Sequence, residues 1–109
     1  GNVGTLDEMV QRLQTRLSKD PNNAETLRML GWTLFSMDRF SEAADAYGKA
    51  AAIEPRNAPL LAAYGEALVR AADGQVRPEA VGAFDAALAL DPKIGVKRRA
   101  DALRRARLG

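Results

Sequence analysis

Apolar side chains along this chain recur every three or four residues, which is the spacing of one face of an α-helix. They never alternate with polar ones over the length that a strand requires. Prolines and other turn-forming residues divide the pattern into segments. The pattern predicts an all-α protein of antiparallel helix hairpins, with six helices over residues 5–19, 23–37, 41–53, 57–72, 78–90 and 94–107.

Part of the pattern occurs twice. One set of residues recurs 34 positions later: Leu27, Leu30, Gly31 and Leu34 return as Leu61, Tyr64, Gly65 and Leu68. A second set recurs 37 positions later: Ala43, Tyr47, Ala50 and Pro55 return as Ala80, Phe84, Ala87 and Pro92. The difference places three additional residues in a turn around residues 72–75, where extra length costs little. Two copies of one helix hairpin are therefore expected.

Each copy has the composition of a close-packed hairpin. The glycine on the apolar face of the first helix lets the second helix approach, and the second helix brings one aromatic ring between alanines. We therefore expect Tyr47, Tyr64 and Phe84 in the core. Asp38 and Gly74 stand where the first helices must turn, and a proline ends each hairpin.

These residues resemble the tetratricopeptide repeat, with Leu27, Leu30, Gly31, Leu34, Ala43, Tyr47, Ala50 and Pro55 at its consensus positions. The resemblance implies a short superhelix of stacked hairpins. We expect one domain over residues 1–109: an N-terminal helix of a partial repeat (5–19), a first repeat (24–57), a second repeat with the insertion (58–94) and a C-terminal capping helix (94–108).

In such a stack the first helix of each repeat lines the concave wall, one turn away from its packing face. The predicted peptide-binding positions are Glu25, Arg28, Trp32, Phe35, Ser36, Ala62, Glu66, Val69 and Arg70. Trp32 and Phe35 are not required by the repeat, and aromatic side chains are enriched at binding hot spots. The alternative is that both rings pack against the N-terminal helix.

Composition excludes most catalytic schemes. The chain has neither cysteine nor histidine, so thiolate metal sites, disulfides and His-assisted nucleophiles are absent. No phosphate-binding loop or metal-ligand spacing occurs. We expect no enzymatic activity, no cofactor and no metal. Residues 93–109 carry seven basic side chains and one acidic one, which leaves open an alternative as a nucleic-acid or membrane adaptor, although a solvated cap is favoured.

A wider set of residues resembles one family, the periplasmic tetratricopeptide domain of CycH-type cytochrome c biogenesis proteins. The resemblance covers residues 5–92 and includes Met9-Val10 in the opening helix, Met29-Leu30-Gly31 in the first repeat and Pro78-Glu79-Ala80 after the lengthened turn. It implies a chaperone that captures the C-terminal helix of apocytochrome c for the haem-ligation machinery. It also implies a place in the bacterial periplasm, within an inner-membrane complex, with the tether outside these residues.

One further function remains open. A generic repeat scaffold would assemble a different complex or self-associate. Capture of chaperone tails is not expected, because the tetratricopeptide domains that do this use a lysine and asparagines, whereas Arg28, Trp32 and Ala63 stand at those places.

Overall fold

A computed structural model describes residues 5–95, and all of the regular structure in that range is helical. The helices are α1 (Leu6–Lys19), α2 (Ala24–Ser36), α3 (Phe40–Ile53), α4 (Ala58–Ala71) and α5 (Pro78–Leu90). Every end lies within one residue of the predicted end, so the all-α prediction is confirmed. Residues 93–95 are also helical, and the rest of the predicted sixth helix and most of the basic segment lie outside the described residues.

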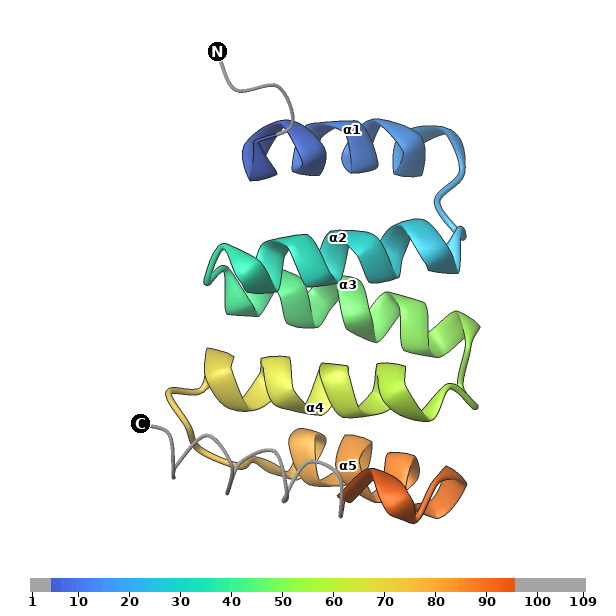
Figure 1. Ribbon diagram of the computed structural model, residues 1–109, viewed down its shortest axis with the longest axis vertical. Helices are drawn as coiled ribbons and strands as arrows, with labels where there is room; N and C mark the ends of the chain where they lie inside the picture. Colours follow the sequence, from blue (N-terminus) through green and yellow to red (C-terminus); the bar gives the residue numbers. More distant parts are fainter. Residues whose placement is uncertain (1–4, 96–109) are drawn as a thin grey trace.

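The helices stack in chain order, and each contacts the next (Figure 1). Consecutive helices run in opposite directions, so α2 and α3 form one antiparallel hairpin and α4 and α5 form another. As a result α2 and α4 run in the same direction, and α3 packs against both of them. This is the arrangement of a tetratricopeptide helical repeat.

The turns that lead into α2 and α4 have the same geometry at their helix caps. Asn23 caps α2, since its side-chain oxygen accepts a hydrogen bond from the backbone N–H of Thr26 at 2.9 Å. Asn57, 34 positions later, caps α4 by accepting from the N–H of Leu60 at 3.1 Å. An asparagine at this position satisfies a backbone donor that the first helical turn leaves without a partner. The two repeats therefore share the capping asparagine of this turn as well as their apolar residues. In each repeat the cap fixes the residue at which the next helix begins.

The turns inside the two hairpins differ in length. Residues 37–39 join α2 to α3, and Asp38 adopts the left-handed conformation with φ 59°. Residues 72–77 join α4 to α5, with Asp73 at φ 55° and Gly74 at φ 90°. A left-handed residue commonly ends a helix, because it lets a following N–H return to a free carbonyl. The second turn is thus three residues longer than the first, at the place where the insertion is predicted.

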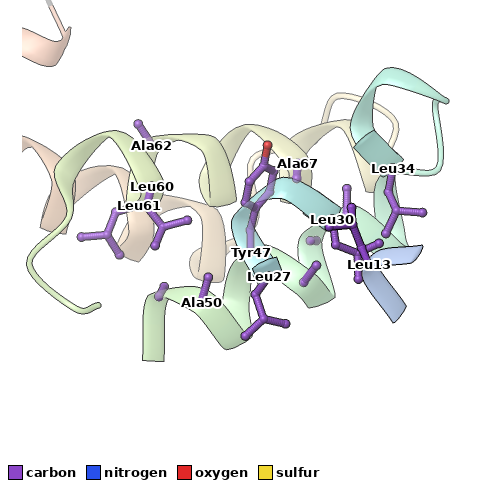
Figure 2. Packing of buried hydrophobic residues seen from close by; sticks show 14 of the residues in the cluster. Leu13, Leu27, Leu30, Leu34, Tyr47, Ala50, Leu60, Leu61, Ala62 and Ala67 are labelled. Carbon is purple, nitrogen blue, oxygen red and sulfur yellow. The ribbon is translucent and has the colours of Figure 1, made fainter. Parts of the chain in front are cut away.

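Small residues bring the helices close together in the core (Figure 2). A Cβ added to Gly31 would lie 2.7 Å from Cδ1 of Tyr47, and one added to Gly65 would lie 2.9 Å from Cε1 of Phe84. Real Cβ atoms do not approach so closely, so each ring occupies the space that its glycine leaves. Core alanines surround the rings, and the leucines of α1, α2 and α4 fill the remaining volume. Tyr47 is buried as predicted, whereas Tyr64 and Phe84 are half-buried.

Candidate functional site

A pocket of about 250 Å³ lies on the surface where α2, α3 and α4 meet. We call it the aromatic pocket; its lining residues are Trp32, Phe35, Tyr47, Ala63 and Glu66. Three of the five are aromatic, and Glu66 is the only one with a charge. Three consecutive helices therefore supply one mostly apolar site.

Trp32 is the most exposed aromatic residue of this site. Its exposed fraction is 59%, so most of the side chain faces solvent. Met29, one turn before it on the same helix face, is 41% exposed. Two large exposed apolar side chains one turn apart on the same helix face are unusual, because the solvent-facing side of a helix in a globular protein normally carries polar residues.

Phe35 belongs to a second aromatic contact beside the pocket. Its ring meets that of Phe40 edge to face, with centroids 5.0 Å apart and an interplanar angle of 71°. The Arg70 guanidinium carbon lies 4.6 Å from the Phe40 centroid and 5.5 Å from the Phe35 centroid. Both distances suit cation–π attraction. The end of α4 is thereby held on the ring pair contributed by α2 and α3.

Tyr47 contributes to the core and to the pocket. Its exposed fraction is 7%, and the ring packs over Gly31 while also lining the pocket. Burial raises the pKa of the Tyr47 phenol above its ordinary value, because removal of water disfavours the phenolate. The pocket wall is therefore a fixed, neutral ring.

Six of the nine predicted site residues lie outside the pocket lining: Glu25, Arg28, Ser36, Ala62, Val69 and Arg70. Glu25 is exposed near the start of α2, and Ser36 is exposed at its end, where its hydroxyl donates to the Trp32 carbonyl oxygen at 2.9 Å. Arg28 is half-buried, with its Nε 3.0 Å from Oε1 of Glu54. Val69 is half-buried, and its carbonyl accepts from the N–H of Gly74 at 2.8 Å. Arg28 and Val69 have evident structural roles.

The prediction for Ala62 is wrong, because this residue is only 1% exposed. Ala62 occupies the same repeat position as Arg28, 34 residues earlier. A long side chain at that position reaches the surface, as Arg28 does, but a methyl group stays within the packed layer. The next residue, Ala63, lines the pocket instead.

The sequence interpretation also missed Met29, Phe40 and Ala63. Met29 and Ala63 share one repeat position, so a signal was present: the position one residue after Arg28 and Ala62 faces outward in both copies. Phe40 had no such signal, because its role depends on Arg70, which lies 30 residues away.

The part of the chain that the structure describes contains neither a metal-binding cluster nor a membrane-spanning helix. In residues 5–95, His, Cys, Asp and Glu side chains form no group of three or more that could hold a metal ion. Over the same residues, none of the helices combines the length and the apolar character needed to cross a bilayer.

Comparison with known proteins gives two findings. Residues 24–57 match the family model of the tetratricopeptide repeat, a type of repeat that mediates protein–protein interaction. The chain is also 32% identical over 72 residues to the cytochrome c-type biogenesis protein CcmH of Escherichia coli strain K12, and equally to CcmH of Shigella flexneri. The matched region is 66% of this chain and 21% of each relative, so the chain spans about a fifth of their length.

Proposed function

Because residues 24–57 are a tetratricopeptide repeat, we propose that this chain captures an amphipathic helix of a partner protein on the exposed face of α2 and α4. The single observation that carries the proposal is the exposure of Trp32 beside the aromatic pocket. A helix bound there would cover Trp32 and Met29 with its apolar stripe, which is a common mode of peptide recognition.

The exposed area of Trp32 is large enough to contribute substantially to the free energy of binding. A tryptophan side chain offers roughly 150–250 Å² for burial, and 59% of it is exposed. Covering that part would contribute about 3 kcal/mol at ~25 cal/mol per Å². A micromolar complex requires about 8 kcal/mol in all. Trp32 alone could therefore supply more than a third of the binding free energy.

We further propose that the captured helix is the C-terminal helix of apocytochrome c. The support is the similarity to two proteins named for cytochrome c-type biogenesis, over 72 residues of this chain. In this account the chain is a chaperone that works in the periplasm beside the haem-ligation machinery, as part of an inner-membrane complex. The domain contributes binding alone, since it holds the polypeptide before haem is attached.

The test is a titration with a synthetic C-terminal helix of a bacterial apocytochrome c, followed by Trp32 fluorescence and by calorimetry. Trp32 is the only tryptophan, so its emission reports on this face alone. We expect saturable binding, and we expect Phe35→Ala to weaken it by tenfold or more. Val81→Ala is the matched control, because Val81 is an exposed apolar residue on α5, away from the pocket. Circular dichroism would verify that both variants fold.

The titration distinguishes capture of an amphipathic helix from the specific assignment of apocytochrome c as the partner. Binding of amphipathic helices in general, without preference for the cytochrome peptide, would remove the apocytochrome assignment and leave helix capture. Absence of binding by both methods would contradict helix capture itself.

A scaffold that self-associates is the second candidate, and one observation favours it. Val81, Leu88 and Leu90 on α5 are exposed, which gives that helix apolar side chains on its outer surface. Sedimentation of the free chain distinguishes the two candidates: a concentration-dependent dimer that Leu88→Glu dissociates would support the scaffold. A monomer at high concentration would contradict it.

A further inference from the structure

We propose that the guanidinium of Arg70 binds an acidic side chain of the captured helix, a glutamate or an aspartate that lies about one helical turn from the apolar residue facing the aromatic pocket. This inference rests on the proposed function, and it specifies the charge of the partner at one position.

Two aromatic rings hold the guanidinium of Arg70 at the surface. Arg70 is exposed in the last turn of α4, and its guanidinium carbon lies 4.6 Å from the centroid of Phe40 and 5.5 Å from that of Phe35. The two rings come from different helices and meet edge to face. An arginine that rests on packed rings has already lost part of its rotamer freedom, so a ligand that binds it orders less.

The N–H groups of Arg70 remain available to a ligand. Attraction between a cation and a ring is electrostatic, so it does not consume hydrogen-bond donors. Arginine has five N–H donors at the edge of a planar group, in a fork that matches a carboxylate. Within the part of the chain that the structure describes, Arg28 and Arg39 are paired with carboxylates, whereas Arg70 forms no ion pair. The ring contacts therefore position Arg70 and leave its donors for an acceptor from the partner.

Arg70 lies one helical turn beyond the aromatic pocket. Phe35 lines the pocket and also contacts Arg70. Ala63 and Glu66 line the pocket from α4, and Arg70 follows Glu66 by four residues, which is about 6 Å along the helix axis at ~1.5 Å per residue. A bound helix that lies along α4 covers the same distance in about one turn. Its side chain one turn from the apolar residue at the pocket therefore comes next to Arg70.

Charge determines which side chain is favoured there. A basic residue would bring two cations together. An amide would offer only a neutral acceptor, and hydrogen bonds between neutral groups are about half as strong as charge-assisted ones. A carboxylate can accept two parallel N–H···O bonds from the guanidinium. The partner is thus an amphipathic helix with an acidic residue three or four positions from the apolar residue at the pocket.

The test uses designed amphipathic peptides whose C-termini are amidated, so that a terminal carboxylate cannot imitate the acidic side chain. Glutamate, glutamine or lysine stands four positions after the central apolar residue in one series and four positions before it in the other, because a helix can lie along α4 in either direction. Calorimetry with the intact chain at low salt should give about fivefold tighter binding of the glutamate peptide than of the glutamine peptide in one series, and weaker binding still of the lysine peptide. Salt at about 0.5 M should reduce this preference to about twofold or less.

Two variants locate the effect, and circular dichroism would verify that both fold. Arg70→Gln should reduce the preference for glutamate over glutamine to about twofold or less, while the glutamine peptide binds within about twofold of its former affinity. Arg12→Gln removes an exposed arginine of α1, outside the aromatic pocket, and it should leave the preference unchanged. Equal binding of the glutamate and glutamine peptides in both series, or a preference that survives Arg70→Gln, would overturn this inference and leave helix capture intact. Failure of every peptide to bind would overturn both.

Discussion

Replacement of Gly31 by alanine should destabilise the fold, although alanine is the better helix former. The new Cβ would lie 2.7 Å from Cδ1 and 2.8 Å from Cε1 of Tyr47, a ring that is buried. Such overpacking costs about 1–3 kcal/mol. The intrinsic gain of alanine over glycine inside a helix is roughly 0.8–1.0 kcal/mol. The net change in the free energy of unfolding is therefore a loss of up to about 2 kcal/mol.

Gly82 is the matched control. It lies inside α5, as Gly31 lies inside α2, but a Cβ added to it would meet nothing within 4 Å. Gly82→Ala should raise the free energy of unfolding by about 1 kcal/mol, from helix propensity alone. The difference between the two variants, about 1–3 kcal/mol, then isolates the steric contribution of Tyr47.

Urea denaturation followed by far-UV circular dichroism measures both changes from the midpoints, provided that the m-values agree. Gly65→Ala provides an independent repeat of the experiment, because its Cβ would meet the Phe84 ring at 2.9 Å. If Gly31→Ala stabilised the protein as much as Gly82→Ala does, the close packing between α2 and α3 would be refuted.

Three further predictions concern the turns and the buried phenol. Gly74→Ala should lower the free energy of unfolding by about 1 kcal/mol, because φ 90° is strained for alanine while its Cβ meets no other atom within 4 Å. Thermal denaturation measures this loss, and an unchanged midpoint would contradict the left-handed conformation of Gly74. Asn23→Ala and Asn57→Ala should each lower the free energy of unfolding by about 1 kcal/mol through loss of a helix cap. The two effects should be equal because the two turns are equivalent, and a variant with unchanged stability would argue against the cap that it removes. The pKa of Tyr47 is higher in the folded state than in the unfolded state, so the contribution of the neutral phenol to stability is complete below the unfolded pKa, near 10, and is lost as pH rises through the folded pKa. Tyr47→Phe should therefore lose less stability than the unchanged protein at alkaline pH. An identical dependence of stability on pH in the two proteins would contradict burial of the phenol.

Much of the fold could be predicted from the sequence because its signals are local and occur twice. The period of the apolar residues fixes each helix, and proline or a left-handed residue ends it. Gly31 and Tyr47 match Gly65 and Phe84, so the same close approach could be predicted in both hairpins. The positions of these rings follow from the repeat alone.

The site was less predictable because it depends on how far a side chain extends and on how one repeat sits on the next. Arg28 and Ala62 have equivalent places on their helices, yet only the longer side chain reaches the surface. The contact of Arg70 with Phe40 joins the end of α4 to the start of α3, and helical periodicity contains no information about that distance. The sequence marks Trp32 as a candidate, because nothing in the repeat requires an aromatic ring there.

The central claim is that a partner helix binds the face formed by α2 and α4. Amide and indole NMR spectra of the ¹⁵N-labelled chain, recorded while the apocytochrome c C-terminal helix is added, test it most directly. We expect the largest shift changes at the Trp32 indole and at the amides of Phe35, Ala63 and Glu66, with small changes along α5. Shift changes confined to α5, with the Trp32 indole unaffected, would contradict it.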